Sequence, residues 1–109
     1  MRVRIHVQFA PAGPDGQQLP GRELDERAEI LMDQLLTFEQ GQDPELTNVA
    51  TAHDGILGVI TAEGTLDCPD IEILVAIDVF RKILERAIGS TQNFPPVRIR
   101  RILAEELTG

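Results

Sequence analysis

Imidazole and thiol groups, which have the widest chemical use, occur at three positions: His6, His53 and Cys68. His6 stands among arginines, whose charge favours the neutral imidazole that accepts a proton, so His6 is a weak candidate for a catalytic base. His53 precedes Asp54, as if a carboxylate oriented a base. Adjacent residues of a strand point to opposite faces, however, and a turn explains Asp54 more simply.

Cys68 stands near the expected start of a helix, where a thiolate is stabilised, although a capping or packing role is the simpler interpretation. Two distant histidines and one cysteine do not provide the ligand spacing of a metal site. The sequence also has no glycine-rich phosphate loop, dinucleotide-binding motif or nucleophile elbow. We therefore expect no metal and no cofactor, and we favour a non-catalytic function.

The composition narrows the class of protein. The chain has 109 residues, of which 18 are acidic and 10 basic, and the formal net charge of −8 argues against general nucleic-acid binding. A single cysteine excludes an intrachain disulfide, and no apolar stretch has the length of a signal peptide or a membrane span. We expect one soluble, cytoplasmic domain over residues 1–109, without membrane contact.

Apolar periodicity predicts the elements of the first part of the chain. Residues 2–9 alternate between apolar and polar, which indicates a half-buried strand, and the proline- and glycine-rich residues 10–21 indicate a loop. From 22 to 40 the apolar residues recur every three or four positions, which predicts an amphipathic helix that ends at Gly41. This helix is expected to bury one apolar stripe: Leu24, Ala28, Leu31, Leu35 and Phe38.

A hairpin is predicted next, from two apolar-rich runs at 46–52 and 56–62. The Asp54-Gly55 pair between them favours a two-residue turn, with His53 opposite Ile56. Neither face of this hairpin is clearly polar, so the pattern leaves open which face meets the core.

The last part of the chain is expected to contain a helix and a strand. Asp67 is the predicted N-cap of the helix, which runs to about Ile88. Residues 97–103 alternate and indicate a strand. A short helix that begins at Pro96 is the rival interpretation, because Arg101 interrupts the alternation.

The resulting order, β-α-β-β-α-β, predicts a ferredoxin-like α+β sandwich. Such a sandwich has a four-stranded antiparallel sheet with two helices on one face. We expect the first and last strands to be neighbours at the centre of this sheet.

Two surfaces of this fold could bind a partner. The open face of the sheet is expected to carry a cationic cluster that suits an anionic ligand or a partner: Arg2, Arg4, His6, Arg98 and Arg100. The simpler alternative is a solvated face whose arginines pair with acids such as Glu105. This face lacks the aromatic residues that RNA-binding sheets use for stacking. The second surface is a set of surplus apolar residues on the second helix, Leu74, Val75 and Val79, which predicts a subunit contact.

Three functions remain after these arguments. The leading hypothesis is a small interaction or regulatory protein that forms a homodimer or binds another protein. The second is a ferredoxin-like dimeric enzyme or binding domain for a small anionic metabolite, with His6 as the base. The third is an acidic inhibitor or decoy of a basic partner protein, suggested by the acidic residues of the first helix.

Overall fold

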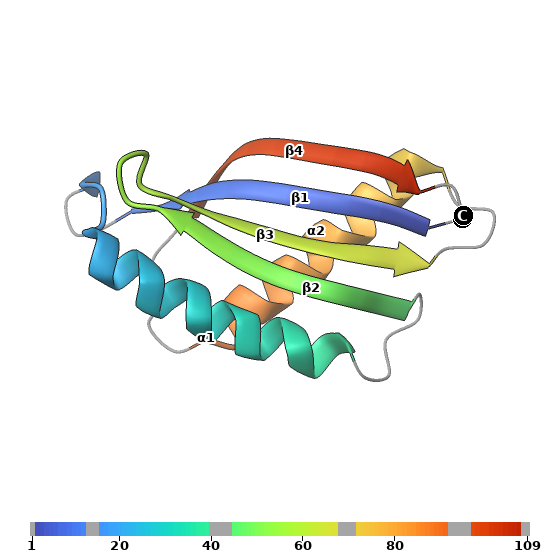
Figure 1. Ribbon diagram of the computed structural model, residues 1–109, viewed down its shortest axis with the longest axis horizontal. Coiled ribbons are helices and arrows are strands. Elements are labelled where there is room, and N and C mark those ends of the chain that lie inside the picture. The colour runs from blue at the N-terminus through green and yellow to red at the C-terminus, as the bar shows by residue number, and fades with distance from the viewer. Residues whose placement is uncertain (1, 13–15, 40–44, 68–71, 92–96, 108–109) are drawn as a thin grey trace.

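The computed structural model describes residues 2–12, 16–39, 45–67, 72–91 and 97–107 of the chain. These residues form a ferredoxin-like α+β fold in the predicted order β-α-β-β-α-β, shown in Figure 1. The elements are β1 (Arg2–Pro11), α1 (Gly21–Glu39), β2 (Glu45–Asp54), β3 (Val59–Asp67), α2 (Ile73–Gly89) and β4 (Val97–Leu107).

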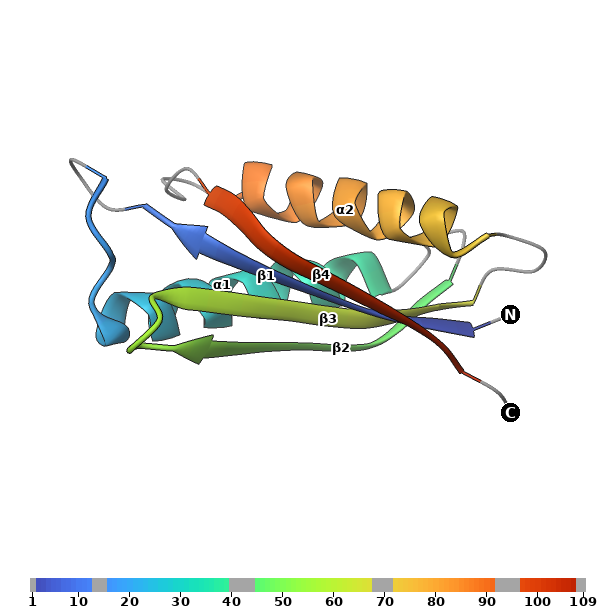
Figure 2. The same ribbon diagram turned by 90° about the horizontal axis from the view of Figure 1, so that it is seen from above.

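The four strands form one antiparallel sheet in the order β2-β3-β1-β4, with both helices on the same face (Figure 2). The first and last strands are neighbours as expected, and β1 is a central strand, but the predicted central place of β4 is wrong. The β2–β3 hairpin places β3 along one side of β1. The connection through α2 therefore places β4 along the other side of β1. The sheet is therefore centred on β1 and β3, and it has edges at β2 and β4.

The core lies between the sheet and the helices. The alternation of β1 is confirmed, because its apolar side chains are buried against the helices while its polar ones face the open side. The predicted stripe of α1 is also confirmed at four positions, and α2 adds five buried residues. The residues that β1, α1 and α2 contribute to the hydrophobic core are Val3, Ile5, Val7, Phe9, Leu24, Ala28, Leu31, Leu35, Ala76, Phe80, Ile83, Leu84 and Ala87.

The hairpin is present, but its predicted turn and register are wrong. Asp54 pairs with Val59 and His53 with Ile60, so the turn spans residues 55–58. The Asp54 carboxylate accepts hydrogen bonds from two backbone N–H groups of the turn, at 2.9 and 3.1 Å, and Gly58 has the positive φ of 68°. The Asp54 carboxylate, which accepts from the turn, and Gly58 at the last position of the turn thus favour a four-residue loop.

The start of the second helix is also corrected. Asp67 pairs with Arg2 and Glu45, so it ends β3 instead of capping a helix. The structure gives α2 a first residue at Ile73. Three residues named in the sequence predictions lie outside the described residues: Gly41, Cys68 and Pro96.

The final segment is a strand, which confirms the preferred interpretation, and it extends to Leu107. The register between β1 and β4 shifts once: Arg101 lies opposite Gln8, whereas Ile99 lies opposite Phe9. This β-bulge leaves Arg100 without a partner on β1. The break in the apolar–polar alternation at Arg101 therefore arises because the strand contains one extra residue, Arg100.

Candidate functional site

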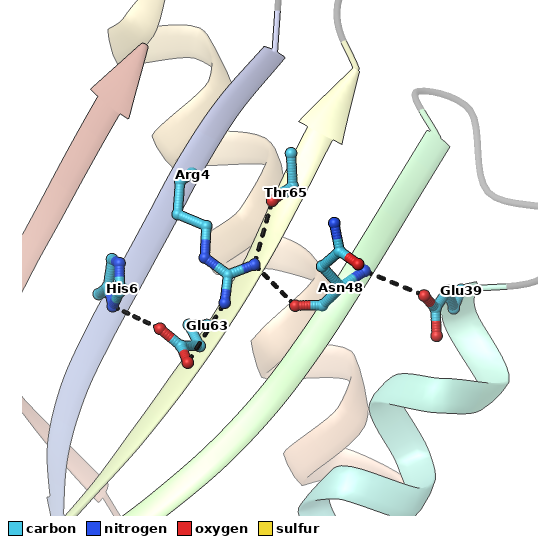
Figure 3. Close-up of polar contacts among 6 residues, drawn as sticks. All are labelled: Arg4, His6, Glu39, Asn48, Glu63 and Thr65. Atoms are coloured by element: carbon cyan, nitrogen blue, oxygen red, sulfur yellow. Dashed lines mark hydrogen bonds and ion pairs between the residues drawn. The ribbon is translucent and has the colours of Figure 1, made fainter. Parts of the chain in front are cut away.

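The centre of the open sheet face carries a network built around the carboxylate of Glu63 on β3 (Figure 3). One oxygen of Glu63 lies 3.2 Å from Nη2 of Arg4, and the other lies 2.7 Å from Nδ1 of His6. The three side chains are between 21% and 37% exposed. Arg4 and His6, two of the three members of the predicted cationic cluster on β1, therefore share one acid.

Arg4 has two further partners in this network. Its Nη1 donates to the hydroxyl of Thr65 at 3.1 Å and to the backbone carbonyl of Asn48 at 2.7 Å. Thr65 is almost fully buried, and Asn48 belongs to β2, so the Arg4 side chain reaches across β3 to the edge of the sheet. The guanidinium of Arg4 is thus largely engaged inside the molecule.

The edge strand β2 is held by this network from one side and by α1 from the other. Between Thr47 and Ala50 its register shifts, and Asn48 there has a φ of 53°, in the left-handed region. The backbone N–H of Asn48 donates to Glu39 of α1 at 3.1 Å (Figure 3). Further along, the hydroxyl of Thr51 donates to the carbonyl of Ala28, also in α1, at 2.9 Å.

The pairing of His6 with Glu63 has the form of an imidazole oriented by a carboxylate. A catalytic site also needs a nucleophile or a second acid–base group on the far side of the ring. Among the residues described, the His6 side chain has no further hydrogen bond or ion pair, and no group of three His, Cys, Asp or Glu is placed to hold a metal ion. The arrangement can fix the His6 ring and neutralise Arg4.

His53 and Asp54 do not form the base-and-orienter pair considered from the sequence. The Asp54 carboxylate binds the turn, and Nδ1 of His53 lies 3.7 Å from Asp25 of α1. His53 is therefore part of the contact between β2 and α1.

The opposite edge of the sheet, β4, lacks such partners. Within the part of the chain that the structure describes, no ion pair involves Arg98, Arg100 or Arg101, and all three are exposed. Two aliphatic side chains of β4 are exposed as well, Ile99 at 38% and Leu103 at 48%. In Figure 1, β4 forms the upper border of the sheet, away from α1.

A cleft of about 650 Å³ lies where β4 begins. Arg98 and Arg100 contribute to its wall, together with the end of β1, the segment 16–18 and the hairpin turn. The predicted cationic cluster is therefore divided: Arg4 and His6 lie in the central network, and Arg98 and Arg100 lie beside this cleft.

The remaining predicted residues are dispersed. Arg2 is exposed at the beginning of β1, in register with Asp67 and Leu107. On α2, Leu74 is 75% exposed and Val75 46%, whereas Val79 is half-buried and packs against the core. The predicted apolar surface of α2 is therefore confined to its first turn.

Sequence reasoning missed Glu63, the acid on which the network depends. A signal was present, because polar residues alternate with apolar ones along β3, and Glu63 is the carboxylate in the middle of that polar series. Its contact with Arg4 and His6 depends on the register between β1 and β3, which the sequence pattern does not specify.

Comparisons with protein-family models, with curated proteins and with solved structures found no match. None of the helices among the described residues has the length and apolar character needed to span a membrane. A function must therefore be argued from the geometry of the fold.

Proposed function

We propose that the protein is a non-catalytic interaction domain that forms a homodimer and that β4 is its binding surface. The observation that carries this proposal is the difference between the two edges of the sheet. The β2 edge is tied to α1 through Asn48 and Thr51, whereas no hydrogen bond of this kind joins β4 to a helix among the described residues. An uncovered edge strand presents unpaired backbone N–H and C=O groups, to which another strand can add.

The side chains of β4 support the same function. Ile99 and Leu103 expose apolar surface on a strand whose other exposed residues are all charged. Both side chains are partly buried within the chain, and a partner strand would remove more of their apolar surface from water. His6 and Arg4, the alternative functional groups, are already paired within the chain.

Light scattering coupled to gel filtration tests this proposal. We expect a mass of twice the 12.0 kDa of one chain at high micromolar concentration. Val75→Asp is the matched control, because it places a charge on the exposed start of α2 and should leave the mass unchanged. A mass of one chain at every concentration would overturn the proposal, and loss of the dimer in Val75→Asp would move the interface to α2.

The cleft beside Arg98 and Arg100 favours a second candidate function, the binding of a small anion. Neither guanidinium has an ion-pair partner among the described residues, so both can donate to phosphate or carboxylate oxygens. Inorganic pyrophosphate should then raise the melting temperature in proportion to the logarithm of its concentration. Arg98→Gln should cancel this rise, and an unchanged melting temperature in the native protein would exclude this function for pyrophosphate.

A further inference from the structure

The charges along β4 are divided by sign. The first half of the strand carries Arg98, Arg100 and Arg101, and the second half carries Glu105 and Glu106. A single sign along an edge strand would repel a second copy of that strand. With the signs divided, an antiparallel copy instead brings the basic half of each strand against the acidic half of the other.

The register with β1 fixes which of these side chains share a face. Arg101, Leu103 and Glu105 lie opposite Gln8, His6 and Arg4, so all three are on the open face of the sheet. Arg101 and Glu105 of one chain are four residues apart, about 13 Å along a strand. They are therefore too far apart to pair with each other, and among the described residues neither forms an ion pair.

Two-fold symmetry leaves few ways to join two β4 strands in one sheet. The open face of one copy continues into the open face of the other only if the two-fold axis is perpendicular to the sheet. The axis then passes between one residue of β4 and the same residue of the second copy. An axis at Ile102 places Arg101 opposite Leu103, and an axis at Ala104 places Leu103 opposite Glu105. Only an axis at Leu103 places Arg101 opposite Glu105 of the second copy, twice over.

We propose that two copies of the chain pair β4 against β4 in antiparallel orientation, with the two-fold axis at Leu103. The two Leu103 side chains, each 48% exposed in the single chain, meet at the axis. Arg101 of each copy forms an ion pair with Glu105 of the other, and Arg100 lies beside Glu106 of the other. This proposal rests on the proposed function, because it names the surface and the register of that homodimer.

Charge exchange tests the ion pairs. Arg101→Glu and Glu105→Arg should each weaken dimerisation on the order of tenfold, because like charges then face each other at two places in the dimer. An equimolar mixture of the two variants should form a heterodimer in which every contact is again between opposite charges. The double variant, which exchanges both charges within one chain, should also recover the dimer. Circular dichroism confirms that each variant is folded.

A cysteine at the axis tests the register independently of charge. In a Cys68→Ser background, Leu103→Cys should give a disulfide-linked dimer on mild oxidation, because directly opposite residues lie within disulfide reach. Leu107→Cys is the matched control: four residues from the axis on each strand, its two copies lie about 26 Å apart and should stay unlinked.

The outcomes separate this inference from the proposed function. A dimer in which the mixed charge variants fail to associate and Leu103→Cys stays unlinked would overturn the β4 register while leaving the homodimer in place. Efficient linkage through Leu107→Cys would likewise overturn the register. A native protein that is a single chain throughout would overturn both proposals.

Discussion

The two edge strands of this sheet are built differently. On β2, a register shift brings Asn48 into the left-handed region, its carbonyl accepts from Arg4, and its N–H donates to Glu39 of α1. On β4, the register shift lies near the start, at Arg100, and the rest of the strand runs regularly to Leu107, with no strand beyond it in the part of the chain that the structure describes.

Under the proposed function, this difference closes one edge of the sheet and keeps the other for a partner. Bulges, charges and a covering helix are the means by which proteins prevent edge strands from pairing. The β2 edge has a bulge and a covering helix. The bulge is held in place by Arg4, which belongs to the network around Glu63 and donates to the carbonyl of Asn48. The charges of β4 would serve the same purpose only if they had one sign, and they do not.

The largest loss of stability is expected when Glu63, the acid at the centre of the network on the open sheet face, is replaced. Glu63→Ala removes the partner of both Arg4 and His6, and it leaves a largely buried guanidinium without its carboxylate. Loss of charged hydrogen bonds of this kind should lower the free energy of unfolding by about 2 kcal/mol. Urea denaturation, followed by circular dichroism, measures this change.

Glu105→Ala is the matched control for Glu63→Ala, because Glu105 lies opposite Arg4 on the other neighbouring strand. Glu105 is exposed, and it forms no ion pair with the residues described, so its removal should change stability by less than about 0.5 kcal/mol. Both variants are compared at a concentration at which the chain is monomeric. If the two variants lower the free energy of unfolding equally, Arg4 depends on both acids. Glu105 of β4 would then be part of the network.

Local patterns predicted the elements well, because alternation and helical periodicity depend on residues close in sequence. The strand at 2–9 and the stripe from Leu24 to Leu35 follow from burial of one face, and the structure confirms both. The hairpin register failed because it depends on the Asp54 carboxylate and the positive φ of Gly58.

The candidate surfaces were only partly accessible to sequence reasoning. The open-face positions of Arg4 and His6 follow from alternation, but their acid comes from a strand more than fifty residues away in the chain. The division of the arginines also depends on tertiary structure, since the bulge at Arg100 resets the phase of β4. Strand order decided that β4 is an edge, and strand order is set by how the crossovers pack.

A smaller effect than that of Glu63→Ala is expected at the β2 bulge, and it compares the two edges directly. Asn48→Val forces a β-branched residue into the left-handed region and should cost about 1 kcal/mol, whereas Asn48→Gly should cost almost nothing. Arg100→Val is the corresponding change on β4, where the unmatched residue has no positive φ, and it should also be nearly neutral. Thermal denaturation of the three variants measures the differences. If Asn48→Val and Arg100→Val cost the same, the β2 bulge is not locked by its backbone conformation, and the closure of that edge would have to come from α1 alone.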